Sequence, residues 1–129
     1  MADKPVEMNK FKEGQFITID GEPCRIVKII KSKPGKHGST KVNIEAIGLF
    51  DEKRHTYMKP SSDTGLTPII EKKTAQVVSI SGDTAQLMDM EDYAMIEAKI
   101  PEEFRAKITE GGEVLYWIIG GKMLIKEVS

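Results

Sequence analysis

The sequence predicts an all-β protein built from two small barrels. Apolar and polar residues alternate with a period of two in several short segments, and turn signals containing glycine separate these segments. A second series of such segments starts after Lys72–Lys73, so residues 1–71 and 72–129 are the two predicted domains. Each domain is close to the lower size limit for an independent hydrophobic core.

Residues 1–71 are predicted to form an SH3-like barrel. Segment 15–19 alternates, and Asp20–Gly21 supplies a hairpin turn before strand composition resumes over 23–30. Further strands are predicted at 41–50, 54–58 and 66–70.

Residues 72–129 are predicted to form an OB-fold barrel, because three strands, a short helix and two strands follow one another there. Pro101 and the two glutamates after it are typical of a helix start, so a short helix is expected over 100–108. Phe104 and Ile108, four residues apart, would form its buried side. The strands are predicted at 75–79, 84–88, 95–99, 114–119 and 123–128.

The composition points to a protein of the reducing cytoplasm. No apolar run approaches the roughly 20 residues that a membrane-spanning helix needs, and the first residues lack the apolar region of a secretion signal. The lone cysteine, Cys24, cannot form an internal disulfide and lies among apolar strand residues. We therefore predict that Cys24 is a small buried residue.

Neither catalysis nor metal binding is predicted, so the protein is not expected to be an enzyme or to hold a metal. With no second cysteine, His37 and His55 form no metal-ligand cluster of useful spacing, and His55 is interpreted as a half-exposed structural residue. A phosphate-binding loop is excluded because a strand, and not a helix, is predicted after Gly35–Lys36.

Several other residues are interpreted as structural. Asp89, Glu91 and Asp92 are expected in a solvated turn. Trp117 could stack on a base, but it is expected to be buried. Three methionines alternate with polar residues at strand spacing and are expected to fill the core; they are Met88, Met90 and Met95.

Charge is unevenly distributed, although the formal net charge is only −1. Residues 1–71 carry a net charge of +2 and residues 72–129 a net charge of −3. No acidic residue lies between Glu22 and Glu45, and that window contains Arg25, Lys28, Lys31, Lys33, Lys36 and Lys41. A local basic segment on a near-neutral body favours an aimed contact over wholesale coating of nucleic acid.

The segment SKPGKHGSTK, residues 32–41, lies between two predicted strands. Pro34–Gly35 presets a turn, because proline fixes φ and glycine permits a positive φ. Gly38 leaves Lys36 without bulky neighbours, and the flanking strands are apolar enough to form a stiff support. We therefore predict that Lys36 is presented at the tip of a hairpin to a macromolecular partner.

The loop sequence Ser32-Lys33-Pro34-Gly35-Lys36-His37-Gly38-Ser39 resembles the hypusine loop of the translation initiation factor 5A family, in its short archaeal form. The similarity extends over essentially the whole chain, including Phe16–Ile17 and the segment 23–27. Thr40 departs from the smaller alanine expected there. Bacterial elongation factor P is a related factor with an extra domain.

The resemblance implies a cytoplasmic translation factor that is modified on Lys36. Deoxyhypusine synthase would transfer a 4-aminobutyl group from spermidine to the ε-amine, and no cofactor would remain bound. The factor would bind the ribosome near the E site and position peptidyl-tRNA for peptide-bond formation at stalled sites such as consecutive prolines, and it would assist termination. Neither a membrane nor DNA is an expected partner. The expected loop and RNA-contact residues are Arg25, Lys33, Pro34, Gly35, His37, Gly38 and Lys41.

The residues alone leave two alternatives open, of which the weaker is an enzyme of unknown type, for which the chain offers no nucleophile–base pair. A general RNA-binding module of two barrels would use Trp117 or Tyr116 as a stacking platform and would need no modified lysine. The intact mass of protein from its native source, with any added group mapped to Lys36, discriminates between this module and a modified factor.

Overall fold

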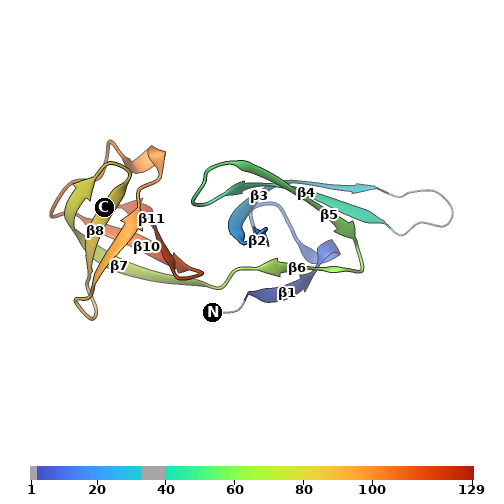
Figure 1. Cartoon of the computed structure of the whole chain (residues 1–129), viewed down its shortest axis with the longest axis horizontal. Helices are drawn as coiled ribbons and strands as arrows, with labels where there is room; N and C mark the ends of the chain where they lie inside the picture. Colours follow the sequence, from blue (N-terminus) through green and yellow to red (C-terminus); the bar gives the residue numbers. More distant parts are fainter. Residues whose placement is uncertain (1–2, 33–39) are drawn as a thin grey trace. The chain divides into compact units, whose positions relative to one another are not determined.

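The structure is a computed structural model of the chain, of which residues 3–32 and 40–129 are described. It divides into two compact units, Met1–Ile69 (unit 1) and Ile70–Ser129 (unit 2) (Figure 1). Lys72–Lys73, the expected joint, lie inside strand β7 (Ile70–Ser81), because that strand already pairs with unit 2 at Ile70 opposite Ile119.

Unit 1 is a six-stranded sheet that curls around its own core, in agreement with the predicted SH3-like barrel. The strand order is β1-β6-β2-β3-β4-β5, and neighbouring strands are antiparallel. The strands are β1 (Lys4–Glu7), β2 (Phe16–Ile19), β3 (Glu22–Ser32), β4 (Lys41–Gly48), β5 (Arg54–Pro60) and β6 (Thr64–Thr67). The buried core consists of Met8, Phe11, Ile17, Ile19, Cys24, Ile26, Val42, Ile44 and Ala46.

Strand β1 is the element that the sequence pattern did not predict. Its sequence, KPVE, is mostly polar, and only Val6 is even half-buried. Proline is tolerated there because β1 is the edge strand of the sheet. The 3-10 turn η1 (Met8–Lys10) follows and places Met8 in the core with no exposed surface.

Unit 2 is a closed five-stranded barrel, as the predicted OB fold requires. The order around the barrel is β10-β11-β9-β8-β7, and the parallel contact of β11 with β9, at Leu124 opposite Lys99, completes the closure. The remaining strands are β8 (Thr84–Asp89), β9 (Met95–Lys99), β10 (Glu113–Ile119) and β11 (Lys122–Val128). The buried core consists of Ala75, Val77, Ala85, Leu87, Ala98, Ile100, Ile108, Val114, Tyr116 and Ile125.

The short helix predicted over 100–108 is a single 3-10 turn, η2 (Glu102–Phe104). The hydrogen bonds of this segment are mostly of the 3-10 type, from the N–H of Arg105 to the Glu102 carbonyl at 3.2 Å and from the N–H of Lys107 to the Phe104 carbonyl at 3.0 Å. The N–H of Ile108 adds a single α-type bond to the Phe104 carbonyl at 3.0 Å. Phe104 and Ile108 still pack against the barrel core, so the predicted apolar pair is correct although the helix is not.

The three methionines predicted in the core lie on the outside of unit 2. The core-facing residues of β8 are Ala85, Leu87 and Asp89, so Met88 faces outward. Met90 is 45% exposed and Met95 is 50% exposed. The period-two alternation was correct, but its phase was wrong because a polar residue occupies a core position.

That polar residue, Asp89, is only 1% exposed and was wrongly predicted to be solvated. The Tyr116 hydroxyl donates to Oδ2 of Asp89, and the N–H groups of Glu91 and Asp92 donate to Oδ1 at 2.8 and 3.2 Å. The pKa of Asp89 is lowered to about 2, mainly because the Tyr116 hydroxyl donates to the carboxylate. Burial acts in the opposite direction, and the bonds from the two N–H groups lower the pKa further. Burial, followed by the bond to Asp89, raises the pKa of Tyr116.

Candidate functional site

The candidate site is built on β3 and β4, the strands that flank residues 33–39. They pair from Cys24 opposite Gly48 to Ser32 opposite Lys41, and β5 pairs along the other edge of β4 (Figure 1). Residues 33–39 therefore connect two neighbouring strands within the β3-β4-β5 part of the six-stranded sheet. Six predicted site residues lie outside the described residues, namely Lys33, Pro34, Gly35, Lys36, His37 and Gly38.

Side chains of β4 alternate between the core and a surface that we call the outer face. Val42, Ile44 and Ala46 are buried, and the intervening residues face outward. Cross-strand partners share a face of a sheet. The outer face therefore consists of four rows, Arg25-Ile47-Arg54, Lys28-Glu45-Thr56, Ile30-Asn43-Met58 and Ser32-Lys41-Pro60.

The outer face carries more positive than negative charge. Its only carboxylate, Glu45, is paired with Arg54 at 3.2 Å between Oε1 and Nη1. Arg25, Lys28 and Lys41 are exposed and form no ion pair with another described residue. These three side chains are consequently available to a polyanion.

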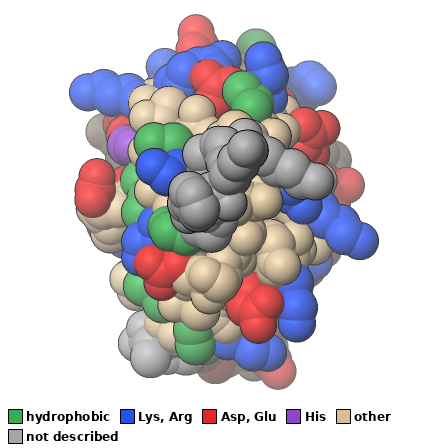
Figure 2. Space-filling model, turned by 90° about the vertical axis from the view of Figure 1, so that its right-hand side faces the viewer, with side chains coloured by type: hydrophobic (Ala, Val, Ile, Leu, Met, Phe, Trp, Pro, Cys, Tyr) green, Lys and Arg blue, Asp and Glu red, His purple; other side chains and the backbone are tan. Residues whose placement is uncertain are grey.

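Apolar side chains are exposed among these charges. Ile30 is 43% exposed and Met58 is 59% exposed, and they lie in one row on either side of Asn43. Figure 2 looks at the molecule from this end of unit 1, and hydrophobic, Lys or Arg, and Asp or Glu side chains are interspersed on the surface that it shows. A surface of this composition can contact phosphates through its cations and sugars or bases through its apolar groups.

Arg25 and Lys41, the two predicted RNA contacts that are described, share the outer face but are far apart on it. Lys41 is in the row next to residues 33–39, whereas Arg25 is opposite Ile47, six residues further along β4. At about 3.4 Å per residue the two rows are roughly 20 Å apart. Lys41 is therefore next to residues 33–39, and Arg25 is too far away to share the same contact.

Two other cations of this region are bonded to the body of unit 1. Lys31 lies on the opposite face from Lys41, and its Nζ donates to the Asn9 carbonyl at 3.4 Å. The Lys59 Nζ donates to the Thr64 carbonyl at 3.3 Å and lies 5.3 Å from the centre of the Tyr57 ring. Arg54 and Met58 were missed as surface residues of the site, although the alternation in their strand contained the signal.

The two residues interpreted as structural in unit 1 have structural surroundings. Cys24 has no exposed surface, its thiol donates to the Glu22 carbonyl at 3.3 Å, and burial, with nearby Glu22 and Asp51, raises its pKa to about 12. His55 is half-buried, and its Nε2 lies 2.7 Å from Oδ2 of Asp51. Desolvation alone would raise the pKa of Asp51, but bonds from the Lys53 N–H and His55 lower it.

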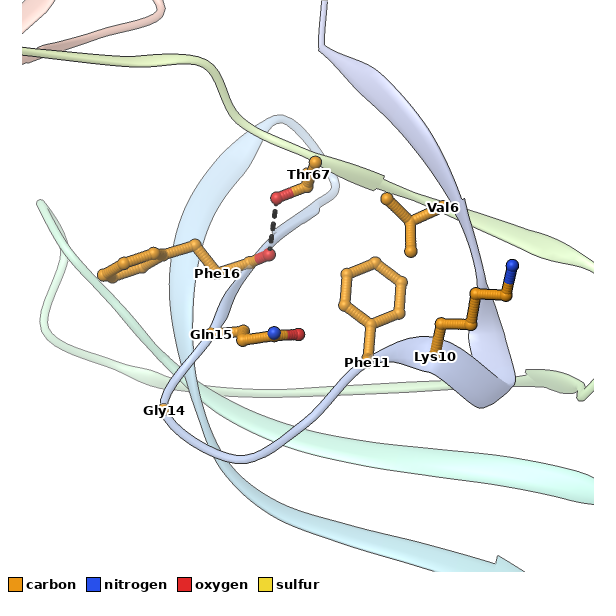
Figure 3. A pocket seen from close by; sticks show the side chains of 7 residues that line it. All are labelled: Val6, Lys10, Phe11, Gly14, Gln15, Phe16 and Thr67. Atoms are coloured by element: carbon orange, nitrogen blue, oxygen red, sulfur yellow. Dashed lines mark hydrogen bonds between the residues drawn. The ribbon is translucent and has the colours of Figure 1, made fainter.

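A hollow of about 450 Å³ lies between β1, β2 and β6 of unit 1 (Figure 3). Val6 and Phe11 give it an apolar lining, and the Thr67 hydroxyl donates to the Phe16 carbonyl at 2.9 Å beside it. Lys10 is the one ionisable residue in its lining, so the hollow lacks a paired acid and base.

Within residues 3–32 and 40–129, no three His, Cys, Asp or Glu side chains come together as a metal site. The same part of the chain contains no helix long and apolar enough to cross a membrane.

The aromatic residues of the alternative, RNA-binding interpretation differ in accessibility. Tyr116 is buried and bonded to Asp89, so it cannot be a stacking platform. Trp117 is half-buried, and the Nζ atoms of Lys72 and Lys126 lie 5.2 and 4.7 Å from the centre of its indole ring. It retains the cation–aromatic chemistry that a nucleic-acid contact uses.

Comparison with known families first defines the class of the two-barrel chain. Residues 2–63 match the family described as translation initiation factor 5A-like, N-terminal. Residues 69–128 match the family described as eukaryotic elongation factor 5A hypusine, DNA-binding OB fold. The fold and both matches make this chain a translation factor and not an enzyme.

Individual relatives then specify the family. The chain is 48% identical to translation initiation factor 5A of Pyrococcus furiosus, over all of this chain and 97% of that protein. It is 49% identical to the factor of Methanosarcina barkeri, over 92% of each. The solved structure of the factor from Methanococcus jannaschii superimposes with a TM-score of 0.87 at 40% identity, covering 98% of this chain and 94% of that one. The chain belongs to the translation initiation factor 5A family.

Proposed function

We propose that this translation factor acts on the ribosome through a lysine that is lengthened by a covalent aminobutyl group. Lys36 is the proposed residue, and deoxyhypusine synthase the proposed modifying enzyme. The factor binds near the E site and positions peptidyl-tRNA for peptide-bond formation at stalled sites such as consecutive prolines, and it assists termination. It works in the cytoplasm, with no DNA or membrane partner and no bound cofactor.

The observation that carries this proposal is the basic outer face of β3 and β4, the two strands that residues 33–39 connect. Residues 33–39 join the two strands whose outer face exposes Arg25, Lys28 and Lys41. These cations attract a phosphate backbone, and the apolar row of Ile30 and Met58 offers contact to sugars and bases. The outer face of the sheet thereby supplies affinity for RNA, and Lys36 supplies the modified side chain.

The chemistry of the modification fits a positioning role. Transfer of the aminobutyl group from spermidine turns the ε-amine of Lys36 into a secondary amine and adds a primary amine at the far end, both cationic near neutral pH. A short side chain with one point charge becomes a slender, longer one. Such a side chain can hold the tRNA in a reactive pose, which lowers the barrier to reaction without a catalytic group on the factor.

The remaining predicted residues have supporting roles in this proposal. Lys33, His37 and Lys41 contact RNA close to the modified lysine, and Arg25 contacts it about 20 Å from Lys41 along the strand. Pro34 presets the turn, and Gly35 and Gly38 leave room for the modifying enzyme.

The test replaces Lys36 by arginine in the native host. Arginine keeps the positive charge but has no amine of the kind that accepts the aminobutyl group. We expect Lys36→Arg to fold normally and to fail in rescuing translation of proline-rich messages. Lys28→Arg, on the outer face, is the matched control and retains full rescue. Full rescue by Lys36→Arg, or a native protein with no mass added at Lys36 and full activity, would refute the proposal.

A second candidate is favoured by one observation. A half-buried tryptophan, Trp117, lies beside two lysine amines, and this combination of an aromatic ring with cations is the one that a general RNA-binding module would use. Trp117→Leu would then abolish binding to an oligouridylate while Lys36→Arg left it unchanged. The main proposal predicts instead that Lys36→Arg abolishes function and that Trp117→Leu has the smaller effect.

A further inference from the structure

Unit 2 exposes a group of apolar side chains that its core does not use. They are Val78, Met88, Met90, Tyr93 and Met95, which we call the methionine face. Tyr93 is 70% exposed, and Val78, Met90 and Met95 are between 44% and 50% exposed. Exposed apolar residues that gather on one surface, as opposed to single scattered ones, mark interaction sites.

Strand pairing brings these residues together. Met88 on β8 is directly opposite Met95 on β9, and Gln76 of β7 is opposite Met88 on the other side. Val78 is the extra residue of a β-bulge on β7, at the point where the pairing with β8 shifts register. The three strands lie side by side in the barrel (Figure 1).

The turn after β8 holds the other two members in place. The N–H of Met90 donates to the Thr74 carbonyl of β7 at 3.1 Å, and the N–H of Tyr93 donates to the Asp89 carbonyl at 3.0 Å. Tyr93 has a left-handed backbone with φ of 61°, which is unusual for a bulky residue. The buried Asp89 carboxylate, bonded to the N–H groups of Glu91 and Asp92, fixes this turn and so presents an exposed tyrosine.

The charges around the methionine face are mainly negative. Glu97 is two residues beyond Met95 on β9, and Glu113 is opposite Gln76, in the same row as Met88. Glu91 and Asp92 are exposed in the turn itself. Lysines are fewer, and Lys73 of β7 interacts electrostatically with the buried Asp89 carboxylate. Lys99 is four residues beyond Met95, and Lys72 is two residues beyond Thr74 with its amine over Trp117.

We propose that the methionine face docks a cationic amphipathic protein segment, one that presents lysines or arginines beside apolar side chains. Methionine is unbranched and polarisable, so the face can adapt to apolar groups of different shape. The acidic surround attracts a basic partner and raises its rate of association. This goes beyond the proposed function, because it needs neither Lys36 nor its modification.

The same charges disfavour two other occupants. RNA phosphates would be repelled by Glu91, Asp92, Glu97 and Glu113. A symmetric pair of chains would set these carboxylates against their own copies. A head-to-tail contact with the basic outer face of a second copy is the remaining form of self-association, and the experiment separates it from the proposed docking.

The experiment uses the full chain labelled at its methionine methyl groups and followed by NMR. The probe is a synthetic helical peptide of leucine and lysine. Its counterparts are the same peptide with glutamate for lysine, and an oligouridylate. We expect the lysine peptide to shift the methyl signals of Met88, Met90 and Met95 saturably. Met58 is the matched control, because it is 59% exposed on the basic outer face of unit 1. Its signal should not move.

Substitutions complete the test. The double variant Met88→Gln, Met95→Gln should bind the lysine peptide about tenfold more weakly or worse, because apolar burial is lost. Glu97→Lys should weaken it as well, and Met58→Gln should not. An unchanged signal of the buried Met8 shows that the fold is intact. The proposal fails if the glutamate peptide or the oligouridylate shifts the same signals, if Met58→Gln weakens binding equally, or if no peptide binds. It also fails if the signals shift with protein concentration alone, which would identify a second copy as the occupant.

Discussion

Replacing Tyr116 by phenylalanine removes one oxygen from the core of unit 2 and tests how that unit is stabilised. The Tyr116 hydroxyl donates to a carboxylate oxygen of Asp89, which is 1% exposed. A hydrogen bond to a charged group contributes about 1.5–3 kcal/mol net. Asp89 keeps the two N–H donors on its other oxygen, so the charge is not left wholly unpaired. We expect unit 2 to lose about 2–3 kcal/mol of unfolding free energy.

A loss of this size is large for so small a unit. Domains have about 0.05–0.15 kcal/mol of stability per residue, so a 60-residue unit such as Ile70–Ser129 has about 3–9 kcal/mol. For domains of this size each kcal/mol lowers the melting temperature by about 4–8 °C. The variant should therefore melt about 10–20 °C lower in its unit 2 transition.

Denaturant unfolding followed by tryptophan fluorescence measures this loss, because the single tryptophan, Trp117, lies in unit 2. The denaturant dependence should keep its slope, since the surface exposed on unfolding is the same. Tyr93→Phe is the matched control. That tyrosine is 70% exposed, so its loss should change stability by less than about 0.5 kcal/mol.

The pH dependence supplies a second readout of the same pair. The pKa of Asp89 is about 2 in the folded protein, below its ordinary value of 3.8. The carboxylate therefore contributes stability above about pH 4, and this contribution is lost as the pH falls towards 2. In Tyr116→Phe the pKa of Asp89 should rise, so less stability remains to be lost over that interval. A loss below about 0.5 kcal/mol, or the same acid dependence in both proteins, would refute the assignment.

Three further outcomes are expected. Cys24, whose pKa is about 12, should resist alkylation at pH 8 in the native protein and react after unfolding. Intact mass measures the added group, and rapid labelling of the native protein would mean that the thiol is accessible. Lys41→Gln should weaken ribosome binding modestly and reduce its dependence on salt by about one unit of slope, and an unchanged slope would exclude a phosphate contact there. Glu45→Gln should strengthen ribosome binding at low salt, because it frees the charge of Arg54. The exposed ion pair that is lost contributes little to stability. Weaker binding would contradict an electrostatic role for the outer face.

Sequence reasoning was strongest where the physical determinant is local. The turn at Asp20–Gly21 and the alternation of 41–50 followed from neighbouring residues, and the structure has β2, β3 and β4 there, with β4 ending at Gly48. The lone buried Cys24 was predicted in the same way. Strand β1 was missed because pairing with β6, which comes some 60 residues later, and not composition, makes Lys4–Glu7 a strand. The roles of Lys33 to Gly38 remain proposals.

By itself the sequence determined the two all-β units, their order, and the basic window that places five other cations around Lys36. These properties depend on the residue composition and on the period of the apolar residues, and both can be read from short segments of the sequence. Only the tertiary structure decided which phase of the alternation faces the core. Asp89 is buried because the barrel brings the Tyr116 hydroxyl of a distant strand to it, and Met88 and Met95 are consequently turned outward. A partner 27 residues away cannot be read from local pattern, and it decides what unit 2 exposes.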